Sequence, residues 1–346
     1  MDNIKIPPVP APLHAAPLAY ENPGFLDSDD GRALRILSEY QEPLVRFRRE
    51  RIADTVVFFG SARIRSLEAA SRALHMLNQP AAQSSMKPEQ QRATTSQQPD
   101  GETGSPETSL VHTAIAMARY YEDARRLAGM VASWSMQIPG PRHRFVVTSG
   151  GGPGIMEAAN RGAYEVGAKT IGLNIQLPFE QNPNPYITPA LNFEFHYFFM
   201  RKYWFAYLAK ALIVFPGGFG TMDEMFEVLT LAQTKKLEQA IPVILYGSDY
   251  WKRVLNLEVL AENGAIAPKD LDLFQFADTP EDAFALLCRG LEPFIDPREP
   301  DGEQPIPAQP QLTAQQTLGP NMNRTRKLGS SARDKGRNTD TNGSDG

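Results

Sequence analysis

The chain of 346 residues contains one cysteine, Cys288, and only five histidines. A single cysteine cannot form an intramolecular disulfide, and no histidine or cysteine lies close enough in the sequence to complete a metal-binding pattern with it. We therefore expect neither a disulfide framework nor a metal site. A chain without disulfides fits a reducing compartment, which predicts a cytoplasmic protein.

Long apolar runs and a positive net charge are also missing. The longest apolar runs, such as Ala211–Phe215 and Ile241–Tyr246, are far too short to cross a bilayer. Prolines interrupt residues 1–20, so this stretch lacks the continuous apolar region of a secretory signal. A formal net charge of −5 gives no general attraction for a nucleic-acid backbone. Membrane insertion and nucleic-acid binding are disfavoured, and any phosphate should be recognised by local loops.

Hydrophobic residues make up 42% of the chain, yet its mean hydropathy is −0.36, which indicates that polar segments dilute a normal core. Three segments have the composition of unstructured chain: the proline-rich residues 1–28, the Gln/Ser/Thr/Pro-rich residues 79–109 and residues 297–346. The basic patches of the last segment are typical of a solvated tail. We expect residues 29–296 to form one domain, with residues 79–109 as a flexible insertion.

Five short apolar segments alternate with longer helical patterns. The expected strands are Thr55–Phe59, Arg144–Thr148, Lys169–Ile175, Ala211–Phe215 and Pro242–Tyr246. They lack polar alternation, which is typical of parallel strands with helices on both faces. The expected helices are Asp30–Arg49, Arg65–Leu77, Leu110–Ser135, Ile155–Val166, His196–Lys210, Met222–Lys236 and Tyr250–Asn263. This succession predicts an α/β fold with a single Rossmann-like, doubly wound parallel sheet flanked by helices.

Three glycine-containing loops follow predicted strands: Gly60–Arg63, Ser149–Gly154 and Pro216–Thr221. Ligands of a doubly wound sheet bind outside the carboxyl ends of the strands. We expect each loop to open a helix, whose free N–H groups and positive dipole end attract an anion. Glycines also serve simply as tight strand-to-helix turns. Three such loops on one sheet edge favour a ligand, and the Pro216–Thr221 loop is the main candidate for holding the phosphate of a nucleotide.

Two common nucleotide motifs are not matched. A dinucleotide fingerprint starting at Gly150 would need glycine or alanine at Ile155, and the next strand, Thr170–Ile175, does not end in the acidic residue that binds a ribose. None of the loops ends in the Gly-Lys-Ser/Thr of a Walker phosphate loop. Binding of NAD and Walker-type chemistry are therefore disfavoured.

Two further features have both a structural and a functional interpretation. Thr221-Met222-Asp223-Glu224 fits a helix capping box, and a carboxylate in the first helical turn would also stay ionised in the helix dipole and could orient water. Arg201-Lys202 lies in an aromatic helix; taken alone, these are solvated or snorkelling cations. His196 has no second ligand at metal spacing and is interpreted as structural.

Together these residues resemble a known family, the Lonely Guy (LOG) phosphoribohydrolases, long mislabelled as lysine decarboxylases. The nine residues Pro216–Glu224 match the family pattern PGGxGTxxE, and Arg201-Lys202 stands where the family has its Arg-Lys pair. The segment Ser149–Asn160 looks like the family's other glycine loop. The resemblance covers about residues 56–287, without the insertion.

The resemblance implies a cofactor-independent and metal-independent hydrolysis of the N-glycosidic bond of nucleoside 5′-monophosphates, such as cytokinin ribotides and AMP, to free base and ribose 5-phosphate. It makes Arg201 and Glu224 the catalytic residues and implies at least a homodimer. Together with the glycine loops it gives these phosphate or substrate contacts: Gly60, Ser61, Gly151, Gly152, Gly154, Glu180, Lys202, Gly217, Gly218, Gly220, Thr221, Asp223 and Thr230. Because fold does not determine function, a non-catalytic nucleotide-binding or signalling protein stays the alternative.

Overall fold

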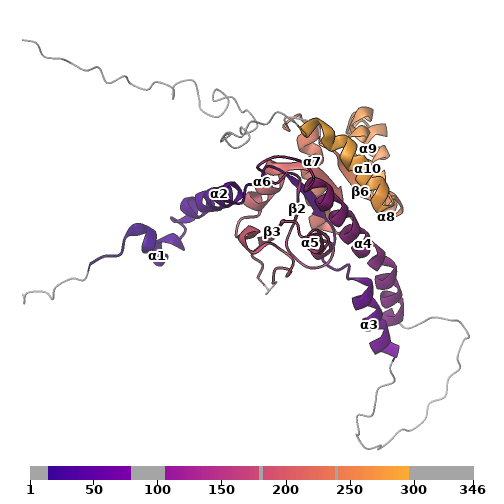
Figure 1. The fold of residues 1–346 in the computed structure, drawn as a ribbon, viewed down its shortest axis with the longest axis horizontal. Coiled ribbons are helices and arrows are strands. Elements are labelled where there is room, and N and C mark those ends of the chain that lie inside the picture. The colour runs from indigo at the N-terminus through magenta and orange to yellow at the C-terminus, as the bar shows by residue number, and fades with distance from the viewer. Residues whose placement is uncertain (1–14, 79–105, 179–181, 238–240, 296–346) are drawn as a thin grey trace, which may run out of the picture. The chain divides into compact units, whose positions relative to one another are not determined.

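Seven parallel β-strands form one sheet in the part of the chain that the structure describes (Figure 1). The structure is a computed structural model that describes residues 15–78, 106–178, 182–237 and 241–295. The strands are β1 Thr55–Phe59, β2 Val146–Ser149, β3 Thr170–Ile175, β4 Asn192–Phe195, β5 Ala209–Val214, β6 Val243–Tyr246 and β7 Gln275–Ala277. The prediction of an α/β fold with a single parallel sheet is confirmed.

The strand order is β4-β3-β2-β1-β5-β6-β7. The chain therefore builds β1 to β4 outward on one side of the sheet and then returns to build β5 to β7 on the other side, which is the doubly wound topology. The order reverses between β1 and β5. In such sheets ligands bind at this switch point, outside the carboxyl ends of the strands.

Helices connect the strands and cover both faces of the sheet. Their bounds are α1 Pro23–Leu26, α2 Arg32–Arg49, α3 Leu67–Asn78, α4 Pro106–Ser135, α5 Ile155–Glu165, α6 Phe198–Leu208, α7 Phe219–Gln233, α8 Ser248–Val254, α9 Glu258–Glu262 and α10 Pro280–Leu291. Short 3-10 turns are η1 Ala19–Glu21, η2 Pro189–Leu191, η3 Pro268–Leu273 and η4 Glu292–Phe294. None of the helices within the described ranges is long and apolar enough to cross a membrane.

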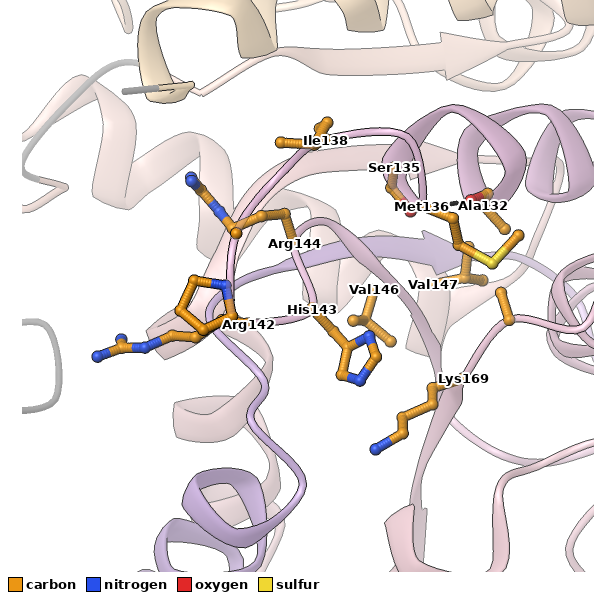
Figure 2. A pocket seen from close by; sticks show the side chains of 13 residues that line it. Ala132, Ser135, Met136, Ile138, Arg142, His143, Arg144, Val146, Val147 and Lys169 are labelled. Atoms are coloured by element: carbon orange, nitrogen blue, oxygen red, sulfur yellow. Dashed lines mark hydrogen bonds between the residues drawn. The ribbon is translucent and has the colours of Figure 1, made fainter. Parts of the chain in front are cut away.

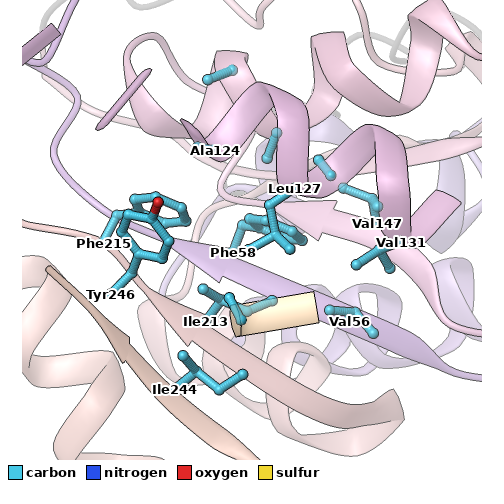
Figure 3. Packing of buried hydrophobic residues seen from close by; sticks show 14 of the residues in the cluster. Val56, Phe58, Ala124, Leu127, Val131, Val147, Ile213, Phe215, Ile244 and Tyr246 are labelled. Atoms are coloured by element: carbon cyan, nitrogen blue, oxygen red, sulfur yellow. The ribbon is translucent and has the colours of Figure 1, made fainter. Parts of the chain in front are cut away.

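A hydrophobic core lies between the sheet and α4, and residues of α5 and α10 belong to the same cluster (Figure 3). Alternate strand residues, such as Val56 and Phe58 of β1 and Ile213 of β5, pack in this cluster with Leu127 and Val131 of α4. All of these side chains are buried. Successive side chains of a strand point to opposite faces, so the neighbours of these residues face the other layer.

The opposite face of the sheet packs against α6. Phe59 of β1 meets Phe205 of α6 with ring centroids 4.8 Å apart. Helix α2 in turn lies on α6, where Phe47 and Trp204 have centroids 5.4 Å apart. The sheet thus has both faces covered, which explains why β1 and β6 are buried at every position.

Several predicted element boundaries are wrong for identifiable reasons. The helix expected to run to Lys210 ends at Leu208, because Ala209 already pairs with Thr55 in the β1–β5 ladder. The helix expected over Tyr250–Asn263 is two helices, since the chain is extended at Leu255. Tertiary pairing and local backbone turns overrode the helical pattern in these places.

Parts of two segments expected to be unstructured contain helices. Helix α4 begins at Pro106, inside the predicted insertion 79–109, and η1 and α1 lie inside the predicted N-terminal segment 1–28. The other residues of the insertion, 79–105, and the tail 297–346 lie outside the described residues. Strands β4 and β7 and helix α10 are not in the predicted set. Strand β4 alternates exposed and buried residues and so lacks the apolar run used to find the other strands, and β7 has only three residues.

Helices α4 and α5 approach each other at two glycines. A Cβ atom on Gly162 of α5 would lie 1.9 Å from the backbone oxygen of Arg125 in α4. A Cβ on Gly129 of α4 would lie 3.3 Å from the backbone oxygen of Gly162. The first distance is impossible without separating the helices, whereas the second needs only a small adjustment.

We therefore expect Gly162→Ala to lower the free energy of unfolding by about 2 kcal/mol, because the helices must move apart. Thermal unfolding should show a Tm lower by about 5 °C. Gly129→Ala is the matched control. Its added Cβ would make a less severe contact, and alanine is a better helix former than glycine, so the decrease in Tm should be clearly smaller. Equal Tm values for the two variants would contradict this packing argument.

Candidate active site

Three glycine loops meet at the switch point of the sheet. The backbone N–H of Ser61, after β1, donates to the backbone oxygen of Pro216, after β5, at 3.0 Å. The backbone N–H of Ile155, which follows the β2 loop, donates to the backbone oxygen of Ser61 at 3.1 Å. Ser61 thus joins the other two loops. The expectation that the Gly60–Arg63 loop opens a helix is wrong, because α3 begins only at Leu67.

The glycines after β1 and β2 are required by close packing. A Cβ on Gly60 would lie 2.6 Å from the Ile155 side chain. Gly151 and Gly154 both have φ of +73°, and a Cβ would lie 2.3 Å from Asn174 Oδ1 and 2.4 Å from the Ser61 backbone oxygen, respectively. The structural interpretation of these three glycines is therefore well supported, whatever further role their backbone has. Gly152 is buried beside them.

The loop after β5 has a more open surrounding. No atom lies within 4 Å of a Cβ built on Gly218 or Gly220. Gly218 is the N-cap of α7 and supplies no side-chain cap for the N–H groups of the first turn. A side chain from α8 holds the loop in place: the Tyr250 hydroxyl donates to the Gly217 backbone oxygen at 2.8 Å. Backbone donors at a helix start with room in front of them suit a phosphate.

The capping box expected from Thr221 and Glu224 does not form. Helix α7 begins at Phe219, so Thr221 is its third residue and Glu224 lies in its second turn. The Thr221 hydroxyl oxygen instead lies close to Gly217, where a Cβ would come within 2.2 Å of it. The helix starts three residues earlier than the local pattern suggests, at Phe219 after the glycine pair.

Glu224 of α7 and Arg201 of α6 form a largely buried ion pair. Arg201 Nη2 lies 3.3 Å from Glu224 Oε1. Only 5% of Glu224 is exposed. Burial raises the pKa of Glu224 to about 7, although Arg201 and Lys202 oppose the shift. Loss of solvation thus opposes ionisation of this carboxylate, which also lies in the second turn of α7 and not in the first turn, where the helix dipole acts most strongly.

Arg201 is not the solvated cation that the sequence taken alone suggested. Its side chain is 15% exposed, and the guanidinium carbon lies 5.2 Å and 5.7 Å from the ring centroids of Phe198 and Phe205. Among the described residues its buried Nε has no hydrogen-bond partner. Burial lowers the pKa of Arg201, and Glu224 opposes this. A buried guanidinium with a donor to spare can bind a further acceptor.

Lys202 joins the two helices through a second set of ion pairs. Its Nζ lies 2.8 Å from Asp223 Oδ2 and 3.0 Å from Glu227 Oε2. Burial lowers the pKa of Lys202, but the hydrogen bonds to the two carboxylates outweigh it and the net pKa is raised. Lys202 and Asp223, both predicted as substrate contacts, therefore bind each other in this structure.

A buried polar network that the sequence did not indicate holds the β2 loop. Asn184 Nδ2 donates to the backbone oxygens of Gly151 and Gly152 at 3.0 Å and 3.1 Å, and to Asn160 Oδ1 at 2.9 Å. Ser149 Oγ donates to the same Asn160 oxygen at 2.6 Å. The sequence motif Ser149–Asn160 includes Asn160, whereas no sequence motif includes Asn184.

Of the remaining predicted contacts, the structure places Thr230 away from the loop. Thr230 is exposed, and its hydroxyl donates to the Phe226 backbone oxygen at 2.7 Å within α7. It lies nine residues beyond Thr221 on the same helix, or about 14 Å along the axis. Glu180 lies outside the described residues. His196 is exposed, with its Nδ1 3.0 Å from Gln176 Oε1.

The cavity of Figure 2 lies at the opposite end of the sheet. It has a volume of about 330 Å³ and is lined by residues that precede β2 and β3, including His143, Arg144 and Lys169. Two of these cations have ion-pair partners: Arg144 with Asp54 at 2.7 Å and Lys169 with Glu50 at 3.0 Å. The cavity is therefore separate from the glycine loops. Within the described residues, no group of three or more His, Cys, Asp or Glu side chains could hold a metal ion.

Comparisons with known proteins agree with the motif. Residues 156–287 match the model of a family described as "Possible lysine decarboxylase". A stretch of 154 residues is 27% identical to the "Probable cytokinin riboside 5'-monophosphate phosphoribohydrolase LOGL5" of Oryza sativa subsp. japonica, and it covers 44% of this chain and 60% of that protein. The chain thus spans less than two thirds of this relative.

Two solved structures are similar at low identity. The molybdenum cofactor binding protein of Rippkaea orientalis is 22% identical, with 49% of this chain and 86% of that chain covered and a TM-score of 0.35. The Moco carrier protein of Chlamydomonas reinhardtii is 23% identical, with 51% and 89% covered and a TM-score of 0.33. Both TM-scores are below 0.5. On the family match and the curated relative, residues 156–287 resemble the lysine-decarboxylase-like family, to which the LOG phosphoribohydrolases belong.

Proposed function

We propose that this protein hydrolyses the N-glycosidic bond of nucleoside 5′-monophosphates, releasing the free base and ribose 5-phosphate. The observation that carries the proposal is the largely buried pair of Arg201 and Glu224 beside the open helix start at Gly218–Thr221. The printed name of the rice relative describes an enzyme of this class. We include adenine ribotides with an isoprenoid group and AMP among the proposed substrates.

In the proposed reaction the 5′-phosphate binds the N–H groups at the start of α7. The bond between C1′ of the ribose and the nitrogen of the base breaks, and the electron pair leaves with the base. Glu224 in its ionised form stabilises the positive charge that develops on the ribose and orients a water molecule. The water oxygen bonds to C1′, and one water proton is transferred, directly or through solvent, to the departing base.

Arg201 has two tasks in this proposal. Its positive charge 3.3 Å from Glu224 favours the ionised carboxylate, which burial otherwise opposes. Its Nε, without a partner among the described residues, can donate to an oxygen of the bound nucleotide. Lys202 and Asp223 hold α6 against α7 and so support the pair. The cytoplasmic location and the homo-oligomeric state stay predictions from the sequence.

The direct test is release of base. The full-length protein incubated with AMP and with an isoprenoid adenine ribotide should produce free adenine or the free modified base together with ribose 5-phosphate, measured by chromatography. If no purine or pyrimidine monophosphate yields base, the proposal fails. Calorimetric binding of nucleotide without product would then support the alternative, a non-catalytic nucleotide-binding protein.

Glu224→Gln removes the charge while keeping the size of the side chain. We expect kcat to fall by at least about 100-fold with little change in the folded structure, because the developing positive charge loses its partner. Glu227→Gln is the matched control, since Glu227 lies one turn further on α7 and pairs with Lys202 rather than Arg201. It should keep most of the activity. Similar kcat values for both variants would argue against the role of Glu224.

The pH dependence of turnover should report on the same carboxyl group. Glu224 must be ionised to act, and its pKa is raised to about 7 by burial. Activity should therefore rise with pH through about 7 and fall about tenfold per unit well below it. A profile of kcat against pH measures this limb. A flat profile between pH 5 and about 8 would exclude a carboxylate with a raised pKa from the rate-limiting step.

A further inference from the structure

Helix α2 lies outside the region that matches the family model, yet it contacts the helix that carries Arg201. The indole N–H of Trp204 in α6 donates to the Glu39 backbone oxygen at 2.9 Å. Arg46 of α2 donates to the backbone oxygens of Ala190 and Asn192 at 3.0 Å and 2.7 Å, just before and at the start of β4. Helix α2 is thus fixed to both β4 and α6.

The start of α6 depends on a carboxylate from α2. Its N-cap residue, Tyr197, provides no side-chain cap. Instead, the backbone N–H groups of His196 and Tyr197 donate to Glu39 Oε1 and Oε2 at 2.7 Å and 3.2 Å. The carboxylate therefore satisfies two backbone donors and places a negative charge at the positive end of the helix dipole.

The peptide groups of Tyr197 connect Glu39 to Arg201. The Tyr197 N–H binds the Glu39 carboxylate, and the Tyr197 backbone oxygen accepts from the N–H of Arg201 at 3.2 Å. Arg201 is the fourth residue of α6, so its Cα lies in the first turn, next to this cap. Its guanidinium then reaches Glu224 with a single contact of 3.3 Å, which a small displacement of the turn would break.

We propose that Glu39 is a positioning residue for the Arg201–Glu224 pair, acting through the N-terminus of α6. This inference rests on the proposed function for its effect on turnover. The geometric part stands on the contacts of Glu39 alone. The neighbouring contact of Lys202 with Asp223 and Glu227 does not replace it, because that contact restrains one side chain and not the first-turn backbone.

Replacing the Glu39 side chain should leave α2 in place. The contact of Trp204 uses the Glu39 backbone oxygen, and Arg46 contributes its own bonds. Arg35 also donates from Nε to the Tyr197 hydroxyl at 3.3 Å. Removal of the carboxylate therefore frees the two N–H groups and lets the first turn of α6 shift relative to α7.

The test follows the ionisation of Glu224 in the full-length protein. Glutamate labelled with ¹³C at the side-chain carboxyl gives a titration by NMR, and the Glu224 signal is assigned by its absence in Glu224→Gln. The groups that face Glu224 are Arg201 and Lys202 from α6 and Asp223 and Glu227 from its own helix. Of these four groups only Arg201 and Lys202 are cations, so the pKa of Glu224 rises if either of them moves away from its carboxylate.

In Glu39→Ala we expect the Glu224 titration midpoint to rise by about one unit, because the cation that favours ionisation moves away. Glu39→Gln should give a smaller rise, since its amide oxygen can still accept from one N–H. Glu42→Ala is the control: its carboxylate, on the same helix, contacts Arg46 and is 55% exposed. Its midpoint should equal that of the wild type.

A merely structural role of Glu39 would lower Tm and leave the midpoint unchanged, and that result would overturn the proposal. If Glu39→Ala does not fold, the midpoint of Glu39→Gln decides. Where base release is detected, kcat of Glu39→Ala should fall by about tenfold or more with a lesser change in KM. If the wild type releases no base, the proposed function fails, while the NMR midpoint still tests Glu39 separately.

Discussion

The parallel pairing of β1 with β5 is the interaction on which the rest of the structure depends. These two strands come from the two halves of the sheet, and their register from Thr55–Ala209 to Phe59–Val214 brings their carboxyl ends to the same level. The loops after both strands are then close enough for the Ser61–Pro216 hydrogen bond. Helix α7 starts from the second of these loops, so the position of Glu224 follows from the same strand pair.

Burial then determines the chemical character of the site. A carboxylate this far from water resists ionisation, and its partner Arg201 is itself poorly solvated. Each charge favours the ionised form of its partner, while burial opposes it. The net result is a pKa of about 7 for Glu224. Strongly shifted pKa values are concentrated at functional sites, although structural ion pairs also show them.

The sequence predicted the features that local pattern controls. Runs such as Thr55–Phe59 are β-branched or aromatic throughout, and the Pro216–Glu224 motif has a family-specific spacing. Prediction from the sequence failed where contacts between residues far apart in the chain determine the structure. The contact of Glu39 with His196 joins residues 157 positions apart, and no periodic pattern in the sequence predicts it. The expected capping box does not form because Gly218, not Thr221, is the N-cap of the helix.

Burial also could not be derived from residue type alone. Arg201 and Lys202 are adjacent cations in the sequence, yet one lies against two aromatic rings and a buried carboxylate, while the other pairs with Asp223 and Glu227. Which one faces Glu224 depends on the rotation of α6 about its axis, which only packing against α2 and the sheet defines. Short strands such as β7 were missed for a related reason. Its three residues form a strand because they pair with β6, and this pairing cannot be read from the sequence.

The ion pairs of Lys202 have a consequence for how an anion would be held. Two carboxylates already contact its ammonium group, so Lys202 itself contributes little net charge to the long-range attraction of a phosphate. Under the proposed function, the peptide dipoles at the start of α7 and the Nε–H of Arg201 would bind the nucleotide, and both act at short range. Such binding should vary little with ionic strength, unlike recognition by a cluster of exposed lysines and arginines.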